Sequence, residues 1–538
     1  MPPPAAAPSP FALPSGPPPI VRPERATAAG SPSEARRVVL ASSLGTVFEW
    51  YDFYLYGSLA VFFGGLFFPR GNETAALLAS LATFGAGFAV RPFGALLFGR
   101  TGDTVGRKHT FLLTIVLMGV STALVGVLPT YEQIGILAPV ALVALRLVQG
   151  LALGGEYGGA ATYVAEHAPV ARRGWHTSWI QTTATAGFLL SLAVILATRL
   201  TVGEAAFHAW GWRIPFLFSV VLLAVSAWMR VRLRESPVFA ELRARGETSR
   251  FPVRESFLRW KNLRVVLVAL FGLTAGQGVV WYTGQFYALL FLQNTLKVPY
   301  QTAYALVAAA LLLGMPSVIL FGALSDRIGR RTIMMTGCLL AAITYVPIFR
   351  AIGSAANPAL AEAVGRAPVV VFSAEQDDPS AAWLTRRGVP YTRQAATLGA
   401  PVVSVGGRPV AAFDTAAYAR ELQRAGYPAA ADPARIDRPR VVLLLVLLMV
   451  WVGMVYGPIA AYLVELFPTR IRYTSVSLPY HIGNGWFGGF LPLIAEARVV
   501  ATGDIYAGLH YPVAIALVTA VVGTVLLRET GRGSLAEA

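Results

Sequence analysis

Apolar runs separated by short polar segments fill most of this 538-residue chain. Each run is close to the roughly 20 residues that an α-helix needs to cross the hydrocarbon core of a bilayer. The pattern therefore predicts twelve transmembrane helices in two groups of six. The first group is expected at about 37–66, 74–100, 109–128, 133–165, 177–200 and 212–232. The second group is expected at about 263–292, 300–323, 332–352, 441–466, 473–497 and 510–528.

Polar stretches divide the chain further. Residues 1–34 are rich in Pro, Ala and Ser and lack the apolar core of a signal peptide, which predicts a disordered cytoplasmic tail. The expected units are this tail, an N-terminal six-helix half at 35–232, a cytoplasmic linker at 233–262, helices 7–9 at 263–352, an extracytoplasmic insertion at 353–440, helices 10–12 at 441–528 and a cytoplasmic tail at 529–538.

A repeated polar turn relates the two groups of helices. The segment GRTGDTVGRK at 99–108 is followed 223 residues later by GALSDRIGRR at 322–331, in register. A second pair of markers, Glu166 with Pro169 and Glu465 with Pro468, matches at an offset of 299. The two offsets differ by 76 residues, so the second half must contain an insertion of about that size. The long polar stretch at 353–440 is its expected place.

The insertion is expected to be a small folded α+β unit. It contains a β-branched run at 368–372, an amphipathic stretch at 379–387 and a predicted hairpin at 401–413. Asp414 or Thr415 is expected to cap a helix that ends at Gly426. Two interpretations remain open, a dispensable surface ornament and a cap that gathers substrate or binds a partner.

Composition and charge agree with a membrane protein. The chain is 55% hydrophobic and 13% charged, against about 25% charged residues in soluble domains. Its net charge of +16 comes from residues in short loops, so membrane orientation explains it better than nucleic-acid binding. The positive-inside rule predicts that both termini are cytoplasmic. Cys338 is the single cysteine, so a disulfide within the chain is excluded.

Several long strings resemble the metabolite:proton symporter branch of the major facilitator superfamily. They are FEWYDFYLYG (48–57), RPFGALLFGRTGD (91–103), RLVQGLALGGEYGGA (146–160), WGWRIPF (210–216), VYGPIAAYLVELFPTRIRYTS (455–475) and YHIGNGWFGG (480–489). That branch includes permeases for proline/betaine, α-ketoglutarate, shikimate and citrate. The resemblance implies an all-α fold of twelve helices in two pseudo-symmetric halves, in a bacterial inner membrane.

The function that the resemblance implies is proton-coupled symport of a small carboxylate-bearing metabolite. The expected partners are this substrate, protons and the lipid bilayer, and we expect a functional monomer with no cofactor, metal or nucleic acid. The chain lacks HExxH, GxSxG, P-loop and CxxC motifs, so an enzyme is not expected. The alternatives are a uniporter or proton antiporter of the same fold, and a non-transporting receptor that uses the insertion to bind its ligand.

Charged residues inside apolar helices are the first candidate site. Each costs roughly 2.5–3.5 kcal/mol at mid-membrane and is therefore expected to be paired or to face a cavity. This predicted charge network consists of Glu49, Asp52, Arg91, Arg146 and Glu156. Glu49 and Asp52 lie one turn apart, which predicts a shared face and makes them the preferred proton site. The alternative is a fixed salt-bridge lattice.

Polar and aromatic residues at similar depth predict a substrate cavity between the halves. The candidates are Trp50, Tyr54, Gln149, Gln277, Trp281, Tyr282, Gln285, Tyr456, His481 and Asn484. The alternative for each is ordinary packing or an interhelical hydrogen bond. Arginines suit a carboxylate, and aromatic faces suit a quaternary ammonium, so organic acids and zwitterions both remain open.

The repeated turns predict a cytoplasmic gate. Its candidate residues are Gly99, Asp103, Gly106, Arg107, Glu166, Asp326, Gly329, Arg330 and Glu465. The two aspartates are placed to accept hydrogen bonds from amides at a helix start. Arg107 and Arg330 are expected to pair with acids such as Glu166 and Glu465. The alternative is a loop that only fixes topology.

Overall fold

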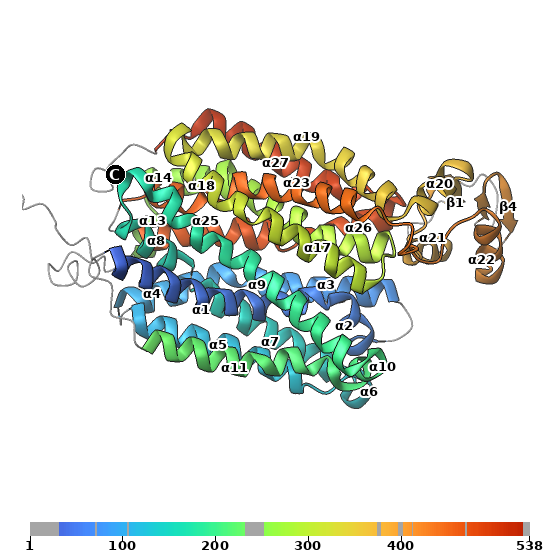
Figure 1. Ribbon diagram of the computed structural model, residues 1–538, viewed down its shortest axis with the longest axis horizontal. Coiled ribbons are helices and arrows are strands. Elements are labelled where there is room, and N and C mark those ends of the chain that lie inside the picture. The colour runs from blue at the N-terminus through green and yellow to red at the C-terminus, as the bar shows by residue number, and fades with distance from the viewer. Residues whose placement is uncertain are drawn as a thin grey trace, which may run out of the picture.

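The computed structural model describes residues 32–69, 73–104, 107–155, 157–231, 252–373, 378–395, 402–411, 413–468 and 471–530. The chain forms a long helical bundle with a small unit projecting from one end (Figure 1). We call that end the insertion end. Helix α1 begins and α27 ends at the opposite end, which we call the lock end.

The elements of the N-terminal half, among its described residues, are all helices. Its elements are α1 (Pro32–Ser58), α2 (Ala60–Phe67), α3 (Glu73–Ala89), α4 (Arg91–Thr104), α5 (Arg107–Val127), α6 (Tyr131–Ile134), α7 (Leu137–Gly154), α8 (Tyr157–His167), η1 (Val170–Arg172), α9 (Arg173–Val202), α10 (Glu204–Ala206), η2 (Phe207–Gly211) and α11 (Arg213–Val231). Helix α1 packs along α9, and α5 packs along α11.

The C-terminal half contains the second series of helices and the insertion. Its bundle elements are α13 (Pro252–Phe257), α14 (Trp260–Ala269), η3 (Leu270–Thr274), α15 (Ala275–Trp281), η4 (Tyr282–Tyr287), α16 (Ala288–Leu290), η5 (Phe291–Thr295), α17 (Tyr300–Gly314), α18 (Pro316–Ile328), α19 (Arg330–Ala356), α23 (Arg438–Tyr456), α24 (Ile459–Leu466), α25 (Arg472–Ile482), η6 (Gly483–Gly488), α26 (Leu491–Thr502), η7 (Ala507–Leu509) and α27 (His510–Leu526).

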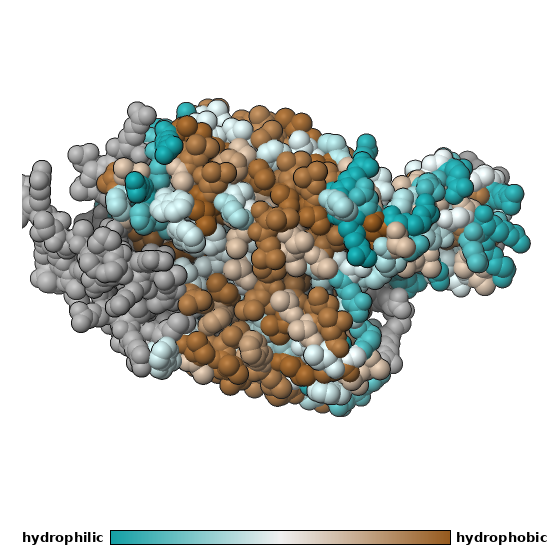
Figure 2. Space-filling model, viewed as in Figure 1, coloured by the Kyte–Doolittle hydropathy of each residue, from teal (hydrophilic) through white to brown (hydrophobic). Residues whose placement is uncertain are grey.

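Within the described residues, eight continuous helices are long and apolar enough to cross a membrane, or nine if the bent pair 204–211 and 213–228 counts as one span. The helical rods α1–α2, α5 and α25–α26 supply the remaining members of the predicted series. The all-helical fold predicted from the sequence is therefore confirmed. Figure 2 shows hydrophobic residues over the side of the bundle and hydrophilic residues gathered on the insertion, as lipid and water would require.

Two of the long helices contain wide π-helical turns. The seventh span contains η3, η4 and η5, and the eleventh contains η6. Each such turn places one extra residue in the helix, so the face that follows is rotated relative to a regular α-helix. These two helices pack against each other through α15 and η6.

The insertion is the predicted α+β unit. It contains α20 (Pro358–Arg366), β1 (Val369–Phe372), α21 (Pro379–Arg386), β2 (Thr392–Gln394), β3 (Val402–Val405), β4 (Arg408–Ala411) and α22 (Thr415–Arg424). The sheet order is β2-β1-β3-β4, with β1 parallel to β2 and antiparallel to β3. The predicted strand, hairpin and capped helix are present, and the Asp414 carboxylate accepts the Ala416 and Ala417 amides at the start of α22. Strand β2 was not predicted.

Hydrogen bonds seat the insertion on the bundle. The Tyr391 amide donates to the Gly503 carbonyl at 3.1 Å, and the Ala431 amide donates to the Lys297 carbonyl at 3.0 Å. The two ends of the insertion also meet, because the Asp437 amide donates to the Ala355 carbonyl at 3.0 Å. The unit is therefore docked on the bundle rather than tethered to it by a loose loop.

Candidate functional site

A small cavity lies between the two halves. Its lining comes from both halves and consists of Thr46, Glu49, Trp50, Arg91, Leu153, Tyr157, Ala160, Ile180, Gln181, Thr183, Tyr456, Tyr480 and His481. Its volume is about 20 Å³, measured as the space open to the centre of a water-sized sphere. That is enough for about one water molecule. The cavity is therefore too small for a metabolite, which needs movement of the halves to enter.

Arg91 is the buried cation of this cavity. It is the first residue of α4, directly after the turn at Val90, and its side chain is fully buried. Its guanidinium carbon lies 3.9 Å from the ring centre of Phe88, 4.3 Å from that of Phe53 and 5.3 Å from that of Trp50. None of its three guanidinium nitrogens has a hydrogen-bond partner among the described residues.

Arg146 is buried in a different environment. Its Nη1 donates to Oε1 of Gln149 at 2.6 Å, and Gln149 donates onward to Thr122 at 2.9 Å. Its guanidinium carbon lies 4.2 Å from the centre of the Phe53 ring. The Phe53 ring therefore contacts both guanidinium groups. Gln149 connects helices within one half and does not line the cavity.

The structure separates the two acids of the first helix. Glu49 lines the cavity with Arg91, whereas Asp52 accepts a hydrogen bond from Ser219 of α11. The prediction that Glu49 and Asp52 act on a shared face is therefore corrected, since α1 has the cavity beside one residue and α11 beside the other. Glu156, the remaining predicted acid, lies outside the described residues.

Aromatic rings connect the halves beside the cavity. Trp50 stacks on Tyr54 at 5.3 Å between ring centres, and Tyr54 stacks on Trp281 at 5.3 Å. The Tyr54 and Tyr282 hydroxyls are 3.4 Å apart. The hydroxyls of Tyr456 and Tyr480 are 3.2 Å apart. The Trp281 and Tyr456 rings meet edge-on at 6.3 Å, so the predicted residues, together with Tyr480, form a continuous aromatic series across the interface between the halves.

Three other predicted cavity residues have different surroundings. Gln277 and Asn484 exchange side-chain hydrogen bonds at 3.1 and 2.8 Å, which join the seventh and eleventh spans, and neither residue lines the cavity described above. The Gln285 amide is buried and has no hydrogen-bond partner in the described part of the chain. His481 does line the cavity, where Tyr157 and Tyr480 meet its ring edge-on.

Several lining residues are not among those predicted from the sequence. Tyr157 stacks on Tyr480 from the opposite half, and Gln181 donates to the Tyr456 carbonyl at 3.3 Å. Thr46 and Thr183 complete the polar lining. Tyr157 stands between glycines in the string GGEYGG. Glycines allow helices to cross closely, so a large aromatic residue among them could have been chosen as a candidate for contact with the opposite half.

A cluster of ion pairs joins the halves at the lock end. Glu465 accepts hydrogen bonds from Arg330 Nε at 2.7 Å and Nη2 at 2.8 Å, which is the contact predicted for this pair. It also accepts from Arg173 Nη1 of the other half at 2.7 Å and from the Thr530 hydroxyl at 2.6 Å. Arg173 was not among the candidates, although it repeats Arg472 in the sequence match. We call Arg173, Asp326, Arg330 and Glu465 the lock.

The Asp326 carboxylate contributes to the lock by accepting hydrogen bonds from backbone amides of the opposite half. It accepts the Gly174 amide at 2.8 Å and the Trp175 amide at 2.9 Å, at the start of α9 in the opposite half. It also accepts from Arg330 Nη1 at 3.0 Å. The helix whose start it binds is therefore in the other half. The negative carboxylate therefore lies at the positive end of the α9 dipole, which is a stabilising arrangement.

The other predicted gate residues have varied outcomes. Gly329 has a left-handed φ of 106° between α18 and α19, which glycine allows without strain. Gly99 faces the Tyr473 ring, since a Cβ there would lie 3.5 Å from it. The side chains of Asp103, Arg107 and Glu166, and the whole of Gly106, lie outside the described residues.

Comparison with known proteins decides the family. A family model described as "Sugar (and other) transporter" matches residues 38–255. The α-ketoglutarate permease of Escherichia coli K12 is 40% identical over 329 residues, which cover 61% of this chain and 74% of the permease. The inner membrane metabolite transport protein YhjE of the same organism is 32% identical over 517 residues, 93% of this chain and 95% of that protein. The chain belongs to the major facilitator superfamily.

A solved structure agrees with this assignment at the level of the fold. The proton:xylose symporter XylE, described as a major facilitator superfamily protein, matches with a TM-score of 0.64 at 15% identity, over 94% of this chain and 98% of the other. The family model and the 32% identity to YhjE show that the chain is a multi-pass membrane protein and a transporter rather than an enzyme.

Major facilitator transporters move substrate between two halves, and here the halves also meet at the insertion end. The Phe84 and Phe286 rings stack at 4.9 Å between centres. The Tyr304 hydroxyl donates to the Ser58 carbonyl at 3.0 Å. The described contacts therefore join the halves on both sides of the cavity, with ion pairs at the lock end and aromatic packing at the insertion end.

Proposed function

We propose that this transporter couples inward proton movement to the uptake of a small carboxylate-bearing metabolite. The observation that carries the proposal is the Arg91 guanidinium, which is buried at the cavity without a hydrogen-bond partner in the described part of the chain. An uncompensated buried charge is strongly unfavourable. A substrate carboxylate matches the guanidinium fork with two parallel hydrogen bonds and would compensate it.

The aromatic series beside Arg91 supports a substrate with a flat or cationic portion. Trp50 and Tyr54 present stacked faces near the guanidinium. Such faces bind quaternary ammonium groups as well as planar carbon frameworks. The similarity to the α-ketoglutarate permease favours an organic acid. The carboxylate is the chemical group that both substrate classes share.

Glu49 is the proton site in this proposal. It lines the same cavity as Arg91, so a carboxylate bound to Arg91 changes the charge that Glu49 faces. Asp52 instead accepts a hydrogen bond from Ser219 at the α1–α11 contact. We therefore assign proton coupling to Glu49 and a structural role to Asp52.

The proposal places the lock end in the cytoplasm. The chain enters α1 and leaves α27 at that end, and the basic linker expected at 233–262 joins the two halves between them. Basic segments are retained on the cytoplasmic side of bacterial membranes. Both termini are then cytoplasmic and the insertion is extracytoplasmic.

Uptake by proteoliposomes tests the proposal. α-Ketoglutarate, shikimate, proline and glycine betaine are supplied outside, with and without an imposed inward proton gradient. At least one is expected to accumulate only with the gradient. Flux without gradient dependence would support a uniporter, substrate export against proton entry an antiporter, and binding without flux a receptor.

Two variants test the assigned residues. Arg91→Gln is expected to lower uptake at least tenfold, because a charge-assisted bond contributes about 1.5–3 kcal/mol. Arg100→Gln, an exposed position on the same helix, is the matched control. Glu49→Gln is expected to abolish accumulation while counterflow exchange persists. Full uptake by Arg91→Gln would overturn the substrate assignment, and accumulation by Glu49→Gln would overturn the proton assignment.

A further inference from the structure

A second cavity opens at the insertion end of the bundle. Its volume is about 500 Å³, measured in the same way as the central cavity. Small-molecule sites are typically about 300–1,000 Å³. In this conformation, the outer cavity has room for a metabolite, whereas the central cavity of about 20 Å³ does not.

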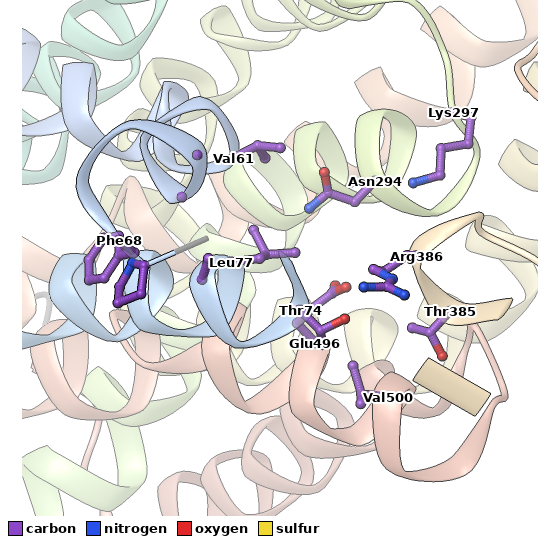
Figure 3. A pocket seen from close by; sticks show the side chains of 14 residues that line it. Val61, Phe68, Thr74, Leu77, Asn294, Lys297, Thr385, Arg386, Glu496 and Val500 are labelled. Atoms are coloured by element: carbon purple, nitrogen blue, oxygen red, sulfur yellow. The ribbon is translucent and has the colours of Figure 1, made fainter. Parts of the chain in front are cut away.

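Three parts of the chain form the walls of the outer cavity. The N-terminal half contributes residues of α2, α3 and the segment between them, including Val61, Phe68 and Leu77. The C-terminal half contributes Glu496 and Val500 of α26, with Asn294 and Lys297. The insertion closes the third side with residues of α21. Figure 3 shows these side chains around one space.

The insertion is built to hold α21 in this position. Asp378 caps the helix by accepting the amides of Ser380 at 2.7 Å and Ala381 at 3.2 Å. Directly after the helix, Gly388 adopts a left-handed φ of 68°, and a Cβ at this position would clash with the Thr295 carbonyl. The Tyr391 hydroxyl then donates to the Val500 carbonyl at 3.2 Å. These contacts place Thr385 and Arg386 at the cavity.

The lining carries charges that suit a small anion or zwitterion. Arg386 comes from the insertion and Lys297 from the bundle, so two cationic side chains approach from separate elements. Thr74, Asn294 and Thr385 add neutral polar groups, and Glu496 adds one carboxylate. Arg386 presents a planar fork of donors that matches a carboxylate. Apolar side chains from α2 and α3 cover the other wall.

We propose that the outer cavity is a binding site for the carboxylate of the transported metabolite, held by Arg386 and Lys297 before the central cavity opens. This inference rests on the proposed function. Because the walls come from both halves, rocking of the halves changes the shape of the site and releases its occupant. The insertion then takes part in uptake by binding substrate, which favours the substrate-gathering interpretation over a dispensable surface unit.

A matched control is present one residue away from Arg386. Arg387 carries the same charge on the same turn, is exposed and lies over the Trp383 ring at 4.4 Å. It does not line the cavity. Substitution of either arginine by Gln changes the net charge equally. A difference between the two variants therefore reports the cavity rather than the general field of the insertion.

Protection of a thiol measures occupancy without transport. Thr385→Cys is introduced into the full chain, where the sole native cysteine, Cys338, is buried. Maleimide labelling is timed with α-ketoglutarate, shikimate, proline or glycine betaine in an Arg91→Gln background, which removes the central carboxylate partner. At least one compound is expected to slow labelling. Adding Arg386→Gln should raise the half-protecting concentration about three- to tenfold, whereas Arg387→Gln should leave it within twofold.

Transport kinetics complete the test. Arg386→Gln is expected to raise KM about three- to tenfold with kcat unchanged, because it weakens capture and leaves the central site intact. Equal behaviour of Arg386→Gln and Arg387→Gln, or absence of protection in the Arg91→Gln background, overturns the outer site. Accumulation without protection would refute this site alone, whereas protection without accumulation would support the site and refute the proposed symport.

Discussion

The ion pair between Arg173 and Glu465 is expected to set how often the lock opens. Arg173→Met removes this contact between the halves without leaving an unpaired acid, because Glu465 still accepts from Arg330 and Thr530. The two amide bonds to Asp326 also remain. The variant therefore removes one cross-half interaction, together with the long 3.4 Å bond from Arg173 Nε to the Ala165 carbonyl within its own half.

Its magnitude follows from geometry and burial. The two side chains are 2.7 Å apart and only 2% and 3% exposed. Hydrogen bonds to charged groups contribute about 1.5–3 kcal/mol, and opening returns both groups to water, so we take about 1–2 kcal/mol for the net effect. That free energy raises the population of the open lock about 5- to 30-fold.

Hydrogen exchange at the start of α9 measures this population. The Gly174 and Trp175 amides donate to Asp326 only while the lock is closed, so their exchange rate reports its opening. Arg173→Met should exchange about 5- to 30-fold faster than wild type in a peptide covering these amides. Arg172→Met, at the exposed neighbour, should match wild type. Unchanged exchange in Arg173→Met would refute the role of this pair in closure.

Two further predictions concern a helix crossing and the insertion. A side chain at Gly158 would clash with the Ser477 hydroxyl of the opposite half. Gly158→Val is therefore expected to speed hydrogen exchange at the start of α9 and to lower uptake at least tenfold. Wild-type exchange and uptake in this variant would refute the role of the crossing. Burial raises the pKa of Asp378, but hydrogen bonds from Ser373, Ala381 and Ser380 outweigh it and hold that pKa below its ordinary value. The ionised cap therefore stabilises α21 above about pH 4, and this stabilisation is lost as pH falls through the folded-state pKa. Asp378→Ala should speed hydrogen exchange in 379–386 about fivefold at pH 7 and by a smaller factor at pH 3. The same ratio of variant to wild-type exchange rates at both pH values would contradict the role of the ionised cap.

The fold could be predicted in large part because membrane helices and short strands have simple signals. Apolar length located the spans, and the unequal repeat offsets located the insertion. Strand β2 could not be found, because TRQ at 392–394 has no apolar alternation and, among the described strands, pairs with β1 alone. Its place in the sheet depends on the tertiary fold.

The site was predicted less completely, since residue type and spacing do not specify the neighbour. Glu49 and Asp52 are one turn apart, yet one faces the cavity and the other Ser219. In the seventh span, π-helical turns shift the register, so regular helical spacing could not show that Gln277 pairs with Asn484. Such contacts between helices require the three-dimensional arrangement.

The two ends of the insertion meet at the hydrogen bond between Asp437 and Ala355. A folded unit whose ends are adjacent adds little loop-closure cost to the host, however long the unit is. Helices α19 and α23 can then keep their places whether a large module or a short turn joins them. The connection is a natural graft point, at which a transporter lineage can gain, lose or exchange a folded domain without redesigning the helices that carry substrate.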